Sequence, residues 1–198
     1  PNAEEMPGPV DTAKYFFKED GREEDRVIIG WIGTPFNAKY LEVVKNVFKD
    51  LHKKYDIVLR LVGPEKDFSM EGVDFELKEW KRDVEVSWLY TFDIGIMPLT
   101  DDPWTIGKAG YKLLQYMSMG IPPIASSVGF NKELIQDGVN GFLAATKEEW
   151  VEKLSLLIEN EELRKKIGKE ARVTIEESYS LNKAEEKLFN IFKKVSSL

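Results

Sequence analysis

Two glycines and two lysines alternate in GKAGYK, residues 107–112, at the start of an apolar stretch with helical spacing. Gly107 and Gly110 let the backbone approach a ligand closely and adopt angles that other residues avoid. The first N–H groups of a helix have no partner within the helix and carry part of its positive dipole, so an anion can accept hydrogen bonds from them. Lys108 and Lys112 add positive charge at the same end. This pattern predicts the binding of a phosphate group, and a diphosphate would fit.

The same pattern has a purely structural interpretation, in which the glycines shape a loop and the lysines are solvated. Neither common nucleotide fingerprint is present, because the stretch lacks the GxxxxGK[ST] order and residues 30–33, GWIG, are not GxGxxG. On spacing alone, both interpretations are open. A helix start contributes about 0.3–1 kcal/mol toward an exposed anion and a charge-assisted hydrogen bond about 1.5–3 kcal/mol, so an anion site here would be local.

Other residues with chemical potential have simpler interpretations. His52 is the one histidine of the chain and is typical of a solvated helix residue, so no histidine pair is available for a metal. The two aspartates at 101–102 precede a proline, which favours a turn over a metal-binding pair. Trp80 and Trp104 each have two open interpretations, stacking on a base or sugar ring or packing under a loop. We therefore expect no metal site.

The elements that must position the 107–112 stretch alternate between strand and helix. Short apolar runs are typical of strands buried on both faces, and five are expected, at 27–33, 57–63, 73–77, 92–98 and 121–126. Helical spacing predicts helices at 41–54 and 84–91, and a third that begins near Ala109 and stops at GIPP, residues 120–123. This alternation predicts an α/β fold, a Rossmann-like three-layer αβα domain with a parallel sheet. Ligands bind outside the carboxyl ends of such strands, where the loop 100–110 is expected to lie.

Beyond the turn signal Asn140-Gly141 the chain is predicted to be helical, at 147–158, 160–178 and 182–196. Residues 1–26 carry three prolines and a charged run, which is typical of an extended linker. The domain organisation expected is therefore a linker at 1–26 and one Rossmann-like domain with a C-terminal helical extension at 27–198. The chain begins with Pro1 rather than Met, from which we expect an excised or processed piece.

Composition excludes several classes of function. The 198 residues are 42% hydrophobic and 32% charged, and no apolar run approaches the roughly 18 residues of a membrane span. There are no cysteines, which removes disulfides, thiolate metal sites and cysteine nucleophiles and makes the cytoplasm the expected location. The net charge of -7 argues against a surface built to bind nucleic acid.

Several motifs occur in a fixed order: PN at 1–2 with VDTAKY at 10–15, IGWIGTP at 29–35, DIGIMPLTDDPW at 93–104, GKAGYKLLQYM at 107–117, MGIPPIAS at 119–126 and GVNGFL at 138–143. Together they resemble the C-terminal, donor-binding domain of the family 4 (group 1) glycosyltransferases, enzymes of the GT-B fold. The likeness spans nearly the whole chain. In that family the first motif lies in the segment between the domains and the last is a turn.

The resemblance implies a retaining transfer of a hexose-type sugar from a nucleotide diphosphate sugar to an acceptor that is a glycan, a lipid or a small molecule, as in polysaccharide biosynthesis. It implies that the donor is a substrate rather than a cofactor, and that no metal is bound. The partner it implies is the protein's own N-terminal acceptor domain, absent from this chain, without which we expect no activity. Location in the cytoplasm or at the inner face of the membrane, with peripheral contact through that other domain, is a further expectation.

This chain departs from the family at specific positions. The family often carries two glutamates eight positions apart, near the donor sugar and the ribose, and these positions hold Gly107 and Gln115. Gln115 can still exchange hydrogen bonds with ribose hydroxyls. The family's arginine after the first glycine is replaced by Thr34, while its lysine five residues later matches Lys39, a candidate phosphate contact.

The candidate donor-binding residues are therefore Gly33, Thr34, Lys39, Lys108, Ala109, Gly110, Tyr111, Lys112 and Gln115. No catalytic residue is assigned. The missing glutamate pair leaves an alternative open, a non-catalytic domain of the same fold that binds a nucleotide sugar or serves as an interaction scaffold. A nucleotide-sugar 2-epimerase would share the fold, but it would need acidic and histidine groups that the sequence does not place.

Overall fold

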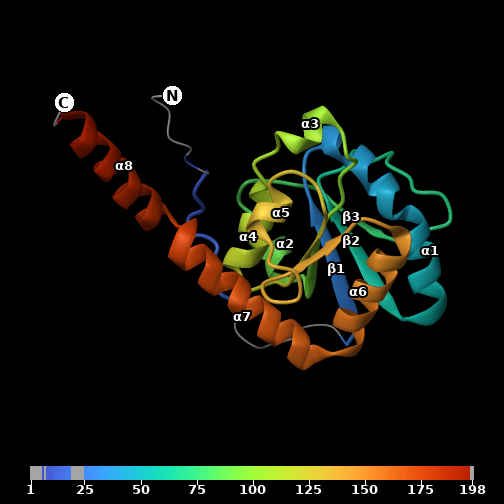
Figure 1. Ribbon diagram of the computed structural model, residues 1–198. Helices are drawn as coiled ribbons and strands as arrows, with labels where there is room; N and C mark the ends of the chain where they lie inside the picture. The colour runs from blue at the N-terminus through green and yellow to red at the C-terminus, as the bar shows by residue number, and fades with distance from the viewer. Residues whose placement is uncertain (1–5, 7, 19–24, 197–198) are drawn as a thin grey trace.

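A computed structural model describes residues 6, 8–18 and 25–196 and shows a six-stranded, fully parallel sheet with helices on both faces (Figure 1). The strand order is β3-β2-β1-β4-β5-β6. The strands are β1 (Val27–Ile32), β2 (Ile57–Val62), β3 (Glu76–Lys78), β4 (Ile94–Met97), β5 (Pro123–Ser126) and β6 (Phe142–Ala144). The predicted α/β, Rossmann-like architecture is confirmed.

The central strands are buried along their whole length because helices cover both faces of the sheet. One charged side chain lies among them, Arg60 of β2, whose Nε donates to Oε2 of Glu76 at 2.9 Å. Arg60 and Glu76 are also register partners of β2 and β3. Pairing satisfies the buried guanidinium and holds the edge strand in register.

Two details of the predicted sheet are wrong. The third strand was expected at 73–77, but Val73 closes a turn onto Met70 and β3 begins only at Glu76. A sixth strand, β6, follows the predicted turn and pairs with β5, where none was expected. Both strands have three residues and lie at the edges of the sheet, so neither has the long apolar run that reveals a strand buried on both faces.

The helices are α1 (Lys45–Lys54), α2 (Glu85–Tyr90), α3 (Pro103–Ile106), α4 (Tyr111–Ser118), α5 (Asn131–Leu134), α6 (Lys147–Glu159), α7 (Glu161–Ser178) and α8 (Leu181–Ser196). Apolar side chains of α1 and α6 pack on one face of the sheet, and those of α2, α4 and much of α7 on the other. No helix in the described ranges is long and apolar enough to cross a lipid bilayer.

Two predicted helix boundaries differ from the structure. The helix expected at 41–54 is a 3₁₀ helix, η1 (Pro35–Val44), followed by α1, because Val44 leaves α geometry with φ -104° and ψ 4°. The loop expected at 100–110 contains α3. Asp102 caps α3 by accepting from the backbone N–H groups of Trp104 and Thr105, at 2.9 and 3.0 Å. Capping thus explains this aspartate without a metal.

The N-terminal stretch that was expected to be an extended linker packs on the domain where the structure describes it. Val10 and Tyr15 are buried, and Val10 forms a parallel bridge with Ser180. The carbonyl of Tyr15 accepts from Arg172 of α7 at 2.9 Å and from Ser118 of α4 at 2.7 Å. The packed fold therefore starts well before residue 27. Whether residues 1–26 join two domains stays a prediction, and 1–5, 7 and 19–24 lie outside the described residues.

Helix α8 extends away from the body of the domain beyond α7 (Figure 1). Its apolar side chains recur on one stripe and are exposed: Leu181, Leu188, Phe189, Phe192 and Val195. Phe189 and Phe192 are 66% and 63% exposed, unusual values for phenylalanine. Within the described structure, this stripe is left uncovered.

Candidate functional site

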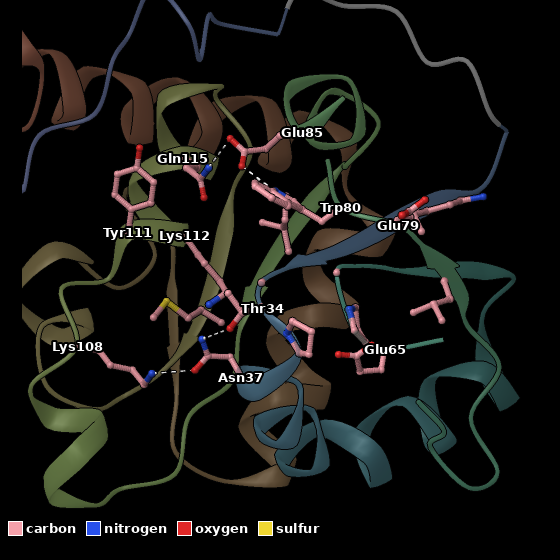
Figure 2. A pocket seen from close by; sticks show the side chains of 18 of the residues that line it. Thr34, Asn37, Glu65, Glu79, Trp80, Glu85, Lys108, Tyr111, Lys112 and Gln115 are labelled. Carbon is pink, nitrogen blue, oxygen red and sulfur yellow. Dashed lines mark hydrogen bonds between the residues drawn. The ribbon is translucent and has the colours of Figure 1, made fainter. Parts of the chain in front are cut away.

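A cavity with a volume of about 930 Å³ lies at the carboxyl ends of β1, β2 and β4 (Figure 2). The strand order reverses between β1 and β4, where one crossover leads to each side of the sheet. Ligands of open α/β sheets bind in the crevice at such a point. A volume of this size is enough for a small-molecule ligand of several rings.

The start of α4 forms one wall of the cavity and offers free backbone N–H groups. The first amide bonded within the helix is that of Leu113, which donates to the carbonyl of Gly110 at 2.8 Å. Within the described ranges, the four amides from Ala109 to Lys112 donate to no protein acceptor. All four of these residues line the cavity. Four consecutive donors without a protein acceptor are able to donate hydrogen bonds to an anion.

Glycine is required at only one of the two positions that the sequence singled out. Gly110 has φ +63°, and a Cβ there would lie 2.7 Å from Cδ1 of Phe130. Gly107 has φ -80°, and the nearest atom to an added Cβ is a carbonyl oxygen at 3.8 Å. The expectation that both glycines adopt unusual angles is therefore wrong for Gly107. Gly110 alone turns the chain so that the amides of α4 face the cavity.

Lys108 is held at the mouth of the cavity by a short chain of hydrogen bonds. Its Nζ donates to Oδ1 of Asn37 at 3.0 Å, and Nδ2 of Asn37 donates to Oγ1 of Thr34 at 3.0 Å (Figure 2). Partial burial lowers the pKa of Lys108, and the neighbouring charge of Lys39 lowers it further. The charge of Asp102 acts in the opposite direction, but Lys108 forms no ion pair in the described structure. The contacts with Asn37 thus orient the ammonium group and leave it available to an anion.

Lys112 lies in the first turn of α4, where the cavity wall largely encloses it. Its Nζ is 5.4 Å from the centroid of the Trp31 ring, and its Cε would lie 2.7 Å from a Cβ at Gly33. Burial, and then the charge of Lys108, lowers the pKa of Lys112 to about 8. Gly33 thus makes room for the lysine stem. An ammonium group kept in a poorly solvated place interacts strongly with an anion that enters.

Lys39 is the one candidate that the structure does not bring into this cavity. Its Nζ lies over the rings of Phe36 and Tyr40, 4.4 and 5.1 Å from their centroids. It lines a neighbouring, shallower cavity of about 470 Å³ with Trp104, which is 67% exposed. Lys108 also lies over Tyr40, at 5.2 Å. Lys39 therefore adds positive charge beside the main cavity rather than inside it.

The wall opposite Lys108 carries a polar cluster that the sequence analysis did not identify. Nε1 of Trp80 donates to Oε2 of Glu85 at 2.8 Å, and Nε2 of Gln115 lies 3.3 Å from Oε1 of Glu85 (Figure 2). Tyr15 from the N-terminal segment also donates to Oε1 of Glu85. Trp80 lines the cavity and is 45% exposed, so it does not pack under a loop; stacking of its ring on a base or sugar stays a prediction.

Eight of the nine predicted residues line one cavity: Gly33, Thr34, Lys108, Ala109, Gly110, Tyr111, Lys112 and Gln115. Sequence reasoning missed Asn37 and Glu85. Asn37 could have been suspected, because it follows the first strand where the cavity must lie, whereas Glu85 has no such signal. Among the residues that the structure describes, no group of three or more histidine, aspartate and glutamate side chains could hold a metal ion.

A family model described as "Glycosyl transferases group 1" matches residues 13–174. The chain is similar to a solved glycosyltransferase from Rickettsia africae ESF-5, with a TM-score of 0.75 and 19% identity over 95% of this chain and 56% of that one. It is also similar to the solved C-terminal domain of a group 1 family glycosyl transferase (LpcC) from Francisella tularensis, with a TM-score of 0.67 and 19% identity over 87% of this chain and 99% of that one.

Two further likenesses bear on function. A structure of Anabaena Alr3699/HepE in complex with UDP-glucose matches 88% of this chain and 50% of that chain, with a TM-score of 0.65 and 18% identity. Spore coat protein SA of Bacillus subtilis (strain 168) is 30% identical over 81 residues, which are 39% of this chain and 22% of that protein. The chain thus spans about half the length of the Rickettsia and HepE structures, and its match covers 22% of the curated relative.

Proposed function

Because the chain belongs to the group 1 glycosyl transferases, we propose that it binds the diphosphate of a nucleotide sugar and forms the donor-binding domain of a retaining glycosyltransferase. The sugar would be of the hexose type, and the acceptor a glycan, lipid or small molecule. The crystallised HepE complexes with UDP and UDP-glucose support a uridine nucleotide as the first donor to test.

One observation carries this proposal: the four amides from Ala109 to Lys112 and the ammonium groups of Lys108 and Lys112 line one cavity. In the described structure the amides donate to no protein acceptor, and neither ammonium group is in an ion pair, Lys108 donating only to the neutral amide of Asn37. Each charge-assisted hydrogen bond contributes about 1.5–3 kcal/mol. A few such bonds outweigh the repulsion from the acidic surface of the chain, which salt screens beyond about 8–10 Å. A diphosphate presents the oxygens that these donors require.

The same groups would assist transfer of the sugar. When the bond between the sugar and the diphosphate breaks, negative charge grows on the leaving oxygen, and donors already oriented toward it lower the barrier. Lys112 is suited to this because its surroundings solvate it poorly. We propose that these cationic side chains neutralise the leaving group where a bound metal would otherwise do so.

The rest of the enzyme would come from a second domain that holds the acceptor. The chain spans 56% of the length of the Rickettsia glycosyltransferase, and the exposed stripe of α8 offers an apolar surface for such a domain. We expect no transferase activity from the 198-residue chain alone, and measurable turnover would contradict this. Action in the cytoplasm or at the inner membrane face, in polysaccharide biosynthesis and with membrane contact through the other domain, belongs to the same proposal.

Titration calorimetry with UDP and GDP tests the binding step. Binding by the isolated chain is expected near about 1 mM, which corresponds to about -4 kcal/mol. Lys108→Ala should raise Kd about tenfold or more, since one charge-assisted bond is lost. Lys166→Ala, on the exposed face of α7, is the matched control and should leave Kd unchanged. Equal Kd values for wild type and Lys108→Ala would remove Lys108 from the phosphate site.

A second candidate function is a non-catalytic domain that binds a nucleotide sugar or a protein partner. It is favoured by Gly107, which offers no side chain at the position where the family often has a glutamate near the donor sugar. The two candidates separate in an assay of sugar transfer by a longer protein that includes both domains. Nucleotide binding with no transfer to any acceptor would favour the non-catalytic one.

A further inference from the structure

A second cavity, of about 470 Å³, lies beside the main one, between the start of η1 and the chain around α3 (Figure 1). It is lined by Phe36, Lys39, Tyr40, Thr100, Asp102 and Trp104. Consecutive residues of η1 line different cavities, since Phe36 lines the second and Asn37 the main one. Among the described residues, none lines both cavities. The second cavity is therefore separate from the proposed diphosphate site.

Two large aromatic side chains, one from η1 and one from α3, are exposed around the second cavity. Phe36 is 63% and Trp104 is 67% exposed, although both residue types are usually well buried. Hydrogen bonds hold the backbone beneath both rings, because Trp104 N donates to Oδ1 of Asp102 at 2.9 Å and Asn37 N donates to the carbonyl of Thr34 at 2.9 Å. Rings held in this way are ready to stack on the apolar face of a ligand.

Lys39 supplies this cavity with a positive charge that the protein does not neutralise. Its Nζ lies 4.4 Å from the centroid of the Phe36 ring and 5.1 Å from that of Tyr40. It forms no hydrogen bond or ion pair with any residue that the structure describes. An anionic group of a ligand can therefore pair with this ammonium group without breaking an existing ion pair.

Asp102 is the one carboxylate among the lining residues of the second cavity, and its own loop holds it. Its Oδ2 accepts from the Thr100 hydroxyl at 2.5 Å, and its Oδ1 accepts from the backbone N–H groups of Trp104 and Thr105. These hydrogen bonds, that from Thr100 first, lower the pKa of Asp102, so it is ionised and only accepts. Each carboxylate oxygen has two lone pairs, so Oδ2 can also accept from a hydroxyl of a ligand.

The groups around the second cavity fit an acidic sugar. A pyranose ring has a face of C–H groups that stacks on aromatic rings and a rim of hydroxyls that donate and accept hydrogen bonds. A carboxylate on that ring would pair with Lys39. A lipid chain would cover the two rings but leave Lys39 unpaired, whereas a ligand without an apolar face would leave Phe36 and Trp104 exposed. A volume of about 470 Å³ lies within the range of about 300–1,000 Å³ of small-ligand sites.

We propose that the second cavity is an acceptor subsite, in which Phe36 and Trp104 stack on an acidic sugar of the hexuronate type and Lys39 binds its carboxylate. This inference rests on the proposed function, since it requires an acceptor. The location is suitable, because Nζ of Lys39 and Nζ of Lys108 lie 5.1 and 5.2 Å from the centroid of the same Tyr40 ring. The sugar would therefore lie next to the proposed diphosphate site, and the second domain would hold the rest of the acceptor.

The test titrates the 198-residue chain, without nucleotide, with two sugars that differ in one group, methyl glucoside and methyl glucuronide. NMR chemical shifts of the backbone amides of residues 36–40 report binding. The glucuronide is expected to bind with a Kd of about 1–10 mM. The glucoside should bind about threefold more weakly, since it lacks the ion pair with Lys39.

Variants separate the role of the rings from that of the charge. Trp104→Ala should raise the Kd of both sugars about tenfold, since a stacking ring is lost. Lys39→Ala should bring the two Kd values together, and Lys39→Arg should keep the preference for the glucuronide. Phe36→Ala should raise both Kd values about threefold. Its matched control is Phe189→Ala, because Phe189 is 66% exposed on α8 and lines neither cavity, so both Kd values should stay unchanged.

The outcomes separate this inference from the proposed function. If neither UDP nor GDP binds the chain, the proposed function fails, and the acceptor role fails with it. If a nucleotide binds but neither sugar does at about ten times the expected Kd, only the subsite is refuted. Equal Kd values of the glucuronide for the wild type and Trp104→Ala also refute it.

A further arm tests whether the acidic sugar belongs to the donor instead. Saturating UDP should change the Kd of the glucuronide less than about twofold, since the two cavities are separate. Displacement of the glucuronide by UDP would contradict the acceptor assignment. Tighter binding of UDP-glucuronate than of UDP-glucose, by a factor that Lys39→Ala removes, would assign the charged sugar to the donor and overturn it too.

A measurement on the wild type alone covers the case in which a variant does not fold. The chain has five tryptophans, of which Trp31 and Trp150 are buried and serve as internal references. The indole N–H signal of Trp104 should move when the glucuronide is added, while those of Trp31 and Trp150 should stay in place. An unmoved Trp104 signal would show that its ring does not contact the sugar and would overturn the inference.

Discussion

Replacing Lys112 by methionine should stabilise the fold and weaken the site at the same time. Burial, together with the charge of Lys108, lowers the pKa of Lys112 from 10.5 to about 8. A difference of one unit between the unfolded and the folded pKa corresponds to about 1.4 kcal/mol. Keeping this lysine charged in the folded protein at neutral pH therefore costs about 3 kcal/mol. Methionine removes the charge but keeps an unbranched apolar stem that can pack on Trp31. Lys112→Met should therefore raise the free energy of unfolding near pH 7 by up to about 3 kcal/mol.

The lowered pKa of Lys112 also predicts how the stability of the wild type changes with pH. The folded pKa of Lys112 lies below the unfolded value, so between about pH 8 and pH 10.5 the unfolded chain binds more protons than the folded one. The stability of the wild type, relative to the variant, should therefore rise with pH across this window. Below about pH 8 the wild type carries the full cost of the buried charge. Above about pH 10.5 that cost is gone.

Denaturant unfolding of wild type and Lys112→Met at about pH 7 and about pH 9.5 measures the effect. The difference between the two proteins should shrink by about 2 kcal/mol between these pH values. Lys166→Met on the exposed face of α7 controls for the general effect of removing a positive charge. A variant less stable than the wild type at neutral pH, or a difference that does not change with pH, would refute the reasoning that Lys112 is held charged at a cost to the fold.

Binding of a nucleoside diphosphate near pH 8 should take up about half a proton per site, because the anion raises the pKa of a Lys112 that is about half neutral before it binds. Calorimetry in two buffers of different ionisation enthalpy measures this uptake, and identical heats in both buffers would contradict it. Gly107→Glu should leave the free energy of unfolding equal or raise it by about 0.4–1 kcal/mol, since Gly107 has φ -80° and open space for a side chain. Denaturant unfolding checks this, and a clear loss of stability would show that the loop does need a glycine here.

The sequence by itself determined the features that depend on short stretches of the chain: the central strands, the helices between them and the free amides at the start of α4. Uninterrupted apolar runs identified the central strands, and their alternation with helices implied the parallel sheet. The order of the strands and helices then placed the GKAGYK stretch at the carboxyl ends of the sheet, which is why eight of nine predicted residues meet in one cavity. The free amides at the start of α4 follow from the same reasoning, since every helix start leaves such groups unpaired.

Only the tertiary structure decided which distant groups meet. Lys39 and Lys108 were both predicted from the sequence as phosphate contacts, yet packing directs Lys39 over two aromatic rings and Lys108 into the cavity. Nothing near Glu85 in the chain indicates that it bonds to Tyr15, which is 70 residues away. Edge strands such as β6 form because a neighbouring strand is available, not because their own residues require it. Pairing, burial and the pKa of Lys112 depend on contacts between segments far apart in the chain, and a local pattern carries no information on these contacts.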